Sequence, residues 1–179
     1  MADGARYDGF PNADAYLESI TPKPSVFVLD DEKKNYKMII EELKEKLGGL
    51  TATTEEELNE VLSRADIIKN DPQKAQELFA KLFRMKKLKA VIVDYDLGVG
   101  GLKWTEVLQQ IKKYIEDYNE KKPVYIGTSW DPQTEEKFKE VGIDMFIPKR
   151  NLYNIWNILL NVLQERTSQH TKQQHLIDT

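Results

Sequence analysis

The sequence contains no cysteine, and its only two histidines, His170 and His175, lie near the C-terminus. Without cysteine, disulfide bonds, thiolate nucleophiles and cysteine-ligated zinc are excluded, and a reducing compartment is favoured. No apolar run approaches the roughly 18 to 20 residues that a membrane-spanning helix requires, so no membrane association is expected. The first residues also lack the basic start and apolar core of a signal peptide. We therefore expect a cytoplasmic location.

An excess of basic residues is also missing, because the 179-residue chain carries a net charge of −4. This balance argues against direct binding of nucleic acid, which usually requires a basic face. Hydrophobic residues make up 40% of the chain and charged residues 31%, as is typical of a water-soluble globular protein. The length favours one domain with a substantial core.

Apolar, β-branched segments alternate with segments of helical periodicity along the chain. The expected strands are 25–30, 50–54, 89–94, 123–128 and 143–149. The expected helices are 32–47, a helix from 55 onward, 72–87, 104–118, 132–141 and 152–166. Capping signals stand at Thr54, Asp71-Pro72 and Asp131-Pro132. Repeated β-α units predict an α/β fold with a doubly wound, five-stranded parallel sheet.

The same pattern divides the chain into a central domain and two flanking segments. Residues 1–24 are expected to be an N-terminal extension that ends in a stiff, proline-containing linker. The domain is expected over 25–166, with a helical insertion at about 66–88. Residues 167–179 are polar and are expected to form a flexible tail.

Polar side chains follow the predicted strands at the points where these strands end. The acids are Asp30, Asp31 and Asp94, and two further strands end at Thr128 and Lys149. In an open parallel sheet the carboxyl ends of the strands form one edge, where the working site lies. Crowded carboxylates repel one another and favour a cation, and their hard oxygen atoms suit Mg²⁺. One carboxylate could then act as a nucleophile toward phosphorus, with a lysine and a hydroxyl holding the phosphoryl oxygens.

The motifs "VLDDE", "IVDYDLG", "YIGTS" and "FIPK" stand in this order at successive strand ends. In this arrangement the chain resembles the receiver domain of two-component response regulators, over about residues 25–165. The resemblance implies a flavodoxin-like receiver fold and a signalling role without enzymatic turnover. It also implies a phosphoryl group received from a partner histidine kinase or phosphotransfer protein, and output through contact with a downstream protein.

The resemblance also assigns the acids. Asp94 would be the phosphoacceptor. Asp30, Asp31 and Asp94 would bind Mg²⁺ together with the backbone carbonyl of Asp96, two residues past the acceptor.

The remaining assignments concern the switch. Thr128 would be the switch hydroxyl, Lys149 would pair with the phosphoryl group, and Phe146 falls where the family has its rotating aromatic residue. The chain departs from the family after the lysine, where Arg150 replaces the usual proline and Pro148 precedes the lysine instead. The segment between the first and third strands is also longer than usual, which suggests an atypical stand-alone member.

Other interpretations stand beside this one. Asp30 and Asp31 could cap a helix, Thr128 could bond to backbone, and Lys149 could be a solvated lysine. A pseudo-receiver would use the fold for binding without phosphorylation. "DYDLG" also matches the Asp-x-Asp core of haloacid-dehalogenase-type phosphatases, with Asp94 as nucleophile and Asp96 as general acid. The order of the motifs argues against this last interpretation, because here an acid pair precedes the proposed nucleophile.

Overall fold

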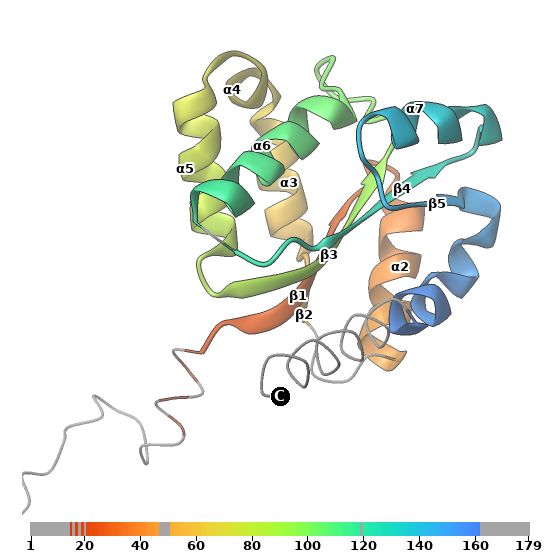
Figure 1. The fold of residues 1–179 in the computed structure, drawn as a ribbon, viewed down its shortest axis with the longest axis horizontal. Coiled ribbons are helices and arrows are strands. Elements are labelled where there is room, and N and C mark those ends of the chain that lie inside the picture. The colour runs from red at the N-terminus through yellow and green to blue at the C-terminus, as the bar shows by residue number, and fades with distance from the viewer. Residues whose placement is uncertain are drawn as a thin grey trace, which may run out of the picture.

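A five-stranded, all-parallel sheet with helices on both faces forms the centre of the molecule (Figure 1). The computed structural model describes residues 15, 17, 19, 21–46, 51–118 and 120–161. The strands are β1 (Lys23–Leu29), β2 (Thr51–Ala52), β3 (Lys86–Asp94), β4 (Val124–Ser129) and β5 (Met145–Pro148). Their order across the sheet is β2-β1-β3-β4-β5, and each neighbouring pair is parallel. The predicted doubly wound parallel sheet is therefore confirmed.

The helices lie in two layers that enclose this sheet. They are α2 (Lys33–Lys46), α3 (Glu55–Ser63), α4 (Ala65–Asn70), α5 (Pro72–Phe83), α6 (Trp104–Asp117) and α7 (Glu135–Glu140). Two 3₁₀ segments, η1 (Pro132–Thr134) and η2 (Lys149–Asn154), precede α7 and the helical residues 155–161. Figure 1 shows α2, η2 and the helical residues 155–161 on one face, and α3, α5 and α6 on the other. None of the described helices is long and apolar enough to cross a lipid bilayer.

Side-chain caps start these helices where the sequence predicted them. The hydroxyl of Thr54 accepts a hydrogen bond from the Glu57 backbone N–H at 3.2 Å, and the Glu57 carboxylate accepts one from the Thr54 N–H at 3.0 Å. This reciprocal pair is a capping box at the start of α3. Asp71 accepts from the Lys74 N–H at 3.1 Å at the start of α5, with Pro72 in the first turn. Asp131 likewise accepts from the Gln133 N–H at 2.9 Å at the start of η1, so all three predicted caps are confirmed.

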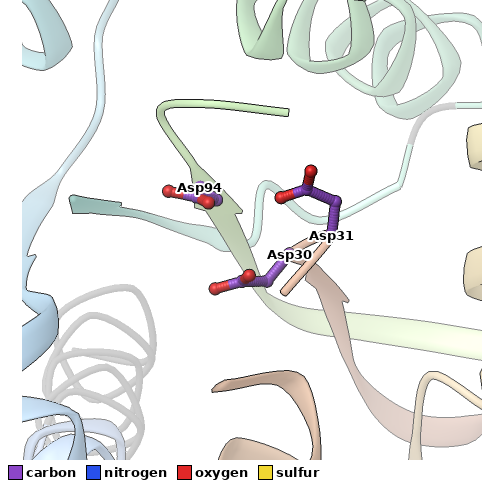
Figure 2. Close-up of side chains that lie close together, drawn as sticks. All are labelled: Asp30, Asp31 and Asp94. Atoms are coloured by element: carbon purple, nitrogen blue, oxygen red, sulfur yellow. The ribbon is translucent and has the colours of Figure 1, made fainter. Parts of the chain in front are cut away.

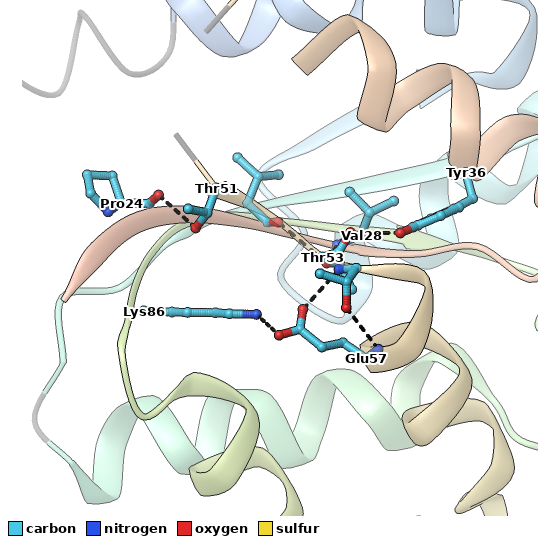
Figure 3. Close-up of polar contacts among 9 residues, drawn as sticks. Pro24, Val28, Tyr36, Thr51, Thr53, Glu57 and Lys86 are labelled. Carbon is cyan, nitrogen blue, oxygen red and sulfur yellow. Dashed lines mark hydrogen bonds and ion pairs between the residues drawn. The ribbon is translucent and has the colours of Figure 1, made fainter. Parts of the chain in front are cut away.

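The second strand is short, and side chains complete its attachment to β1 (Figure 3). Thr53, directly after β2, accepts a hydrogen bond at its hydroxyl from the Val28 N–H at 2.7 Å. Its carbonyl accepts one from the Tyr36 hydroxyl on α2, also at 2.7 Å. Thr51 donates its hydroxyl to the Pro24 carbonyl at 3.2 Å. These bonds hold a two-residue strand in place although Thr51 and Ala52 have little apolar surface to bury.

Two strands begin earlier than the sequence predicted. β1 starts at Lys23, inside the segment expected to be an N-terminal linker, and β3 starts at Lys86, inside the expected insertion. The pairing of Lys23 with Lys86 extends both strands. Pro24 has no N–H to donate. Because β2 pairs with β1 only from Ser25 onward, no hydrogen bond between these two strands is lost at Pro24. The expected ends of the first helix at residue 47 and of the last helix at residue 166 lie outside the described residues.

The expected insertion contains two helices: α5 packs against the sheet, and the shorter α4 buries Ala65 and Ile68 in the same core. The ring of Phe83 on α5 lies 5.2 Å from that of Phe27 on β1 and 5.3 Å from that of Tyr114 on α6, measured between centroids. α5 therefore covers the sheet as an ordinary crossover helix does. α4 is a six-residue helix placed between α3 and α5, in addition to what a crossover requires.

Candidate functional site

Three carboxylates meet at the carboxyl ends of β1 and β3 (Figure 2). The two strands are neighbours in the sheet, and Leu29 pairs with Val93. The next residues, Asp30 and Asp94, therefore lie side by side, and they are 1% and 3% exposed. Asp31 is half-buried, and one carboxylate oxygen from each of the three acids lies within 4.8 Å of the others. The parallel topology thus gathers the acids as the strand ends predicted.

A single buried lysine faces this cluster from the far edge of the sheet. Lys149 is the first residue of η2, directly after β5 rather than within that strand. Its ammonium donates a hydrogen bond to Asp94 Oδ2 at 2.7 Å and lies 3.2 Å from Asp30 Oδ2. The Lys149 side chain is 2% exposed, so it is not a solvated surface lysine. Two buried carboxylates thus share one buried ammonium group, which leaves negative charge uncompensated.

The protonation equilibria of the site reflect this imbalance. Burial raises the pKa of Asp94 to about 7, and the neighbouring Asp30 charge adds to the rise while the Lys149 hydrogen bond opposes it. Burial likewise raises the pKa of Asp30, against the lowering effect of the Lys149 charge. For Lys149, burial lowers the pKa, but the hydrogen bond to Asp94 and the two carboxylate charges outweigh burial and raise it. Asp94 is therefore partly protonated near neutral pH, and the site favours added positive charge.

The donor atoms of the cluster fit a hard divalent cation. Asp30 Oδ2 is buried and accepts no hydrogen bond, and the Lys149 ammonium lies 3.2 Å from it as an ion-pair partner. Asp31 is partly open to solvent and could share a cation with water ligands. Carboxylate oxygens with room for water are the ligands that Mg²⁺ prefers. Among the described residues, the three acids are thus suited to hold Mg²⁺.

Thr128 lies beside Asp94 at the end of the adjacent strand. The two residues pair in the register of β3 and β4, and Thr128 is fully buried. Its hydroxyl is 3.5 Å from the Val93 carbonyl oxygen, at the outer limit for a hydrogen bond. Such a weakly held hydroxyl can reorient toward a new acceptor at Asp94. The alternative interpretation, in which this hydroxyl bonds to backbone, is thus met by a long hydrogen bond to Val93.

Phe146 lies on β5, away from the acid cluster. Its half-buried ring is 5.6 Å from that of Phe138 on α7, which in turn lies 4.6 Å from Trp104 at the start of α6. Trp130, two residues past Thr128, is 61% exposed. The side chain of Asp96 is exposed, in the loop that follows β3.

Two residues near the cluster were not singled out from the sequence. Glu32 donates its backbone N–H to Asp30 Oδ1 at 2.9 Å, and its carboxylate lies 4.0 Å from the Lys149 ammonium. Gly98 approaches Asp31 so closely that an added Cβ would lie 3.0 Å from Asp31 Oδ2. The run of three acids at 30–32 was the available signal for Glu32. The strand ends did not point to Gly98, because its contact with Asp31 depends on the path of a loop.

No protein-family model matches the sequence, and no curated protein matches it either. Solved structures do resemble it. The receiver domain of the histidine kinase CKI1 from Arabidopsis thaliana, complexed with Mg²⁺ and BeF₃⁻, has a TM-score of 0.51 and 19% identity over 81% of this chain and 92% of that chain. The receiver domain of the Francisella response regulator 1452 has a TM-score of 0.50 and 19% identity over 80% and 98% of the two chains.

A third similar structure is the N-terminal domain of an uncharacterized Wolinella succinogenes protein, WS1339. It has a TM-score of 0.51 and 16% identity over 82% of this chain and 98% of that chain. Identities this low show the fold alone. The chain therefore has the flavodoxin-like fold of response-regulator receiver domains, as the order of its motifs predicted.

Proposed function

We propose that this chain is a phosphorylatable receiver that accepts a phosphoryl group on Asp94. One observation carries the proposal: a buried carboxylate at the end of the central strand contacts a buried lysine and lies beside two further acids. This arrangement is costly for the fold, because it concentrates negative charge away from water. A cluster of perturbed acids at the carboxyl edge of a parallel sheet is where a working site is expected.

The chemistry follows from the positions of the side chains. The ionised Asp94 carboxylate supplies an oxygen that forms a bond to phosphorus, while the bond from phosphorus to the donor nitrogen breaks. Lys149 is placed to neutralise a phosphoryl oxygen, since its ammonium already lies 2.7 Å from Asp94. Thr128 supplies a hydroxyl that can donate a hydrogen bond to another oxygen. Bound Mg²⁺, held by Asp30, Asp31, Asp94 and the backbone carbonyl of Asp96, would supply positive charge that stabilises the transferred group.

The phosphoryl donor in this proposal is a partner histidine kinase or phosphotransfer protein, and the output is contact with a downstream protein. We assign the output to the surface formed by β5 and the helix that follows it. Tyr153 is 58% exposed there, and Trp156 is half-buried against α2, with the Lys46 ammonium 5.2 Å from its ring centroid. Phe146 connects this surface to the interior through Phe138. Direct binding of nucleic acid is not part of the proposal.

The test is treatment with a small-molecule phosphodonor, with and without Mg²⁺. The wild-type chain is expected to gain one acid-labile phosphate, and Asp94→Asn is expected to gain none, because an amide does not attack phosphorus. Asp117→Asn is a matched control, since Asp117 is an exposed acid far from the cluster that pairs with Lys113 at 2.8 Å. Acid-labile phosphate retained by Asp94→Asn at the wild-type level would refute the assignment.

The second candidate function is a pseudo-receiver, a binding module that is never phosphorylated. One observation favours it: Lys149 already pairs with both Asp30 and Asp94, so the ion cluster is closed without a phosphate. The same experiment separates the candidates, because a pseudo-receiver would remain unmodified with Mg²⁺ present. A phosphatase of the Asp-x-Asp type would instead release phosphate continuously.

A further inference from the structure

The loop that follows the proposed phosphoacceptor lies between the acid cluster and the extra helix α4. This loop, residues 97–102, has the sequence "LGVGGL" and connects β3 to α6. Leu97 and Leu102 are buried at its two ends, whereas Gly98 and the pair Gly100-Gly101 lie at its surface. Gly100 and Gly101 have φ values of 59° and 66°, a backbone conformation that side chains rarely adopt. The path of the loop thus depends on its glycines and on the side chains that pack against it.

From the outer side, α4 holds the loop in two ways. The Lys69 ammonium donates a hydrogen bond to the Gly100 carbonyl at 3.1 Å. Ala65, buried at the start of α4, packs so close to Gly100 that an added Cβ there would lie 3.2 Å from the Ala65 Cβ. α4 therefore packs against the loop through the Ala65 methyl group and holds it through the Lys69 hydrogen bond.

From the inner side, the same loop touches the acid cluster. An added Cβ at Gly98 would lie 3.0 Å from Asp31 Oδ2. The loop also begins directly after Asp96, whose backbone carbonyl is assigned to the metal in the proposed function. A displacement of the loop would therefore move one assigned metal ligand and open the space beside another.

We propose that α4 is a brace that fixes the loop 97–102 against Asp31 and thereby sets the affinity of the acid cluster for Mg²⁺. Lys69 and Ala65 act as positioning residues, since they touch the loop and not the metal ligands. The link to Mg²⁺ rests on the proposed function, whereas the bracing of the loop does not. Residues that hold the ligands of a metal in place typically change its affinity by about 10- to 100-fold when they are removed.

The first test measures hydrogen exchange of the loop amides in the metal-free protein. Lys69→Met keeps the apolar stem and removes the donor, so exchange over 98–102 is expected to accelerate by about tenfold, the factor that corresponds to losing one hydrogen bond. The matched control is Lys81→Met, since Lys81 is an exposed lysine on α5 that pairs with Glu60 at 2.9 Å, on the far side of the insertion. Equal hydrogen-exchange rates of the loop amides in Lys69→Met and Lys81→Met would refute the inference that α4 holds the loop. This holds whether or not the protein binds metal.

The second test is a Mg²⁺ titration of the same variants by calorimetry. Lys69→Met and Gly98→Ala are each expected to weaken binding by about tenfold, the lower end of the outer-shell range. Lys69→Arg retains a cationic donor and is expected to restore most of the affinity, and Lys81→Met is expected to match the wild type. In phosphorylation assays, Lys69→Met should raise the Mg²⁺ concentration needed for half-maximal rate and leave the rate at saturating Mg²⁺ unchanged.

The two tests distinguish a failure of the brace from a failure of the proposed function. Wild-type protein that binds no Mg²⁺ would refute the metal site, and the exchange test would then decide on the brace alone. Accelerated exchange in Lys69→Met with unchanged Mg²⁺ affinity in both variants would overturn the inference that the brace sets that affinity. A wild type that binds Mg²⁺ but takes up no phosphate would refute phosphorylation, and the exchange and Mg²⁺ titration of the variants would still decide on the brace.

Discussion

Replacing Asp94 with asparagine should stabilise the metal-free protein, by an amount that depends on pH. Asp94 is 3% exposed, lies beside Asp30 and shares one lysine with it. Asparagine has nearly the same volume, and its carbonyl oxygen still accepts a hydrogen bond from Lys149. The substitution therefore removes a buried charge while keeping the packing.

The magnitude follows from the pKa of Asp94, which burial raises from 3.8 to about 7. Because the folded state binds this proton more tightly, the stabilisation is fully present below about pH 4 and is lost as the pH rises through about 7. The difference between the two pKa values corresponds to a loss of at most about 4 kcal/mol in the free energy of unfolding above pH 7. The Lys149 hydrogen bond is already contained in this pKa, so the variant, which resembles the protonated acid, should escape the whole loss. We expect a gain of up to about 4 kcal/mol at pH 8 and of up to about 2 kcal/mol near pH 5.

The assay is urea unfolding of both proteins in EDTA at pH 5 and pH 8, with Asp117→Asn as the exposed control. The advantage of Asp94→Asn should grow with pH, and added Mg²⁺ should stabilise the wild type more than the variant. An asparagine variant that is less stable at pH 8, or that shows the same difference at both pH values, would refute the argument. Asp94 would then be charged and well compensated in the free protein.

Further predictions concern the metal, the core and the switch. Mg²⁺ affinity measured by calorimetry should rise between pH 6 and pH 8, because the metal must displace the proton that Asp94 binds with a pKa of about 7. Asp31→Ala should weaken Mg²⁺ binding at least tenfold, whereas equal affinity would show that Asp31 is only a cap. Gly127→Ala should lower the free energy of unfolding by about 1 to 3 kcal/mol in urea titrations, because the new methyl group would lie 2.5 Å from the buried ring of Phe138. On phosphorylation, hydrogen exchange should change mainly in the segment around Phe146 and the helix after it, and a change confined to 71–86 would place the output face at the insertion instead.

The alternation of apolar and helical segments was enough to predict the sheet and its parallel topology. Parallel strands between helices leave few possible arrangements, and the caps at Thr54 and Asp71 marked the helix starts. Strand starts were less predictable. Lys23 and Lys86 carry no apolar signal and become strand residues only because they pair with each other. Pairing between segments far apart in sequence overrides local propensity at such positions.

The strand ends predicted which side chains would meet at the candidate site. They did not predict how the charges of these side chains compensate one another. That Asp30, Asp94 and Lys149 lie together follows from the topology. That Lys149 is buried, and that it bonds to Asp94 rather than Asp30, depends on how η2 turns after β5. The contact of Gly98 with Asp31 depends on the path of a loop, for which the sequence offers only glycines. The contact of the Trp156 ring with Lys46 is equally a matter of three-dimensional placement.

The position of Lys149 also bears on how the sheet opens. β5 is an edge strand that pairs only with β4, over four residue positions, and edges of this kind are usually the first part of a sheet to unfold locally. Here, withdrawing β5 would carry Lys149 away from Asp94 and Asp30 and leave two carboxylates buried without a counter-ion. Breaking a buried ion pair from one side costs about 3 to 5 kcal/mol. The edge is therefore tied to the centre of the sheet, so that fraying of the last strand and loss of the central strands become one cooperative event.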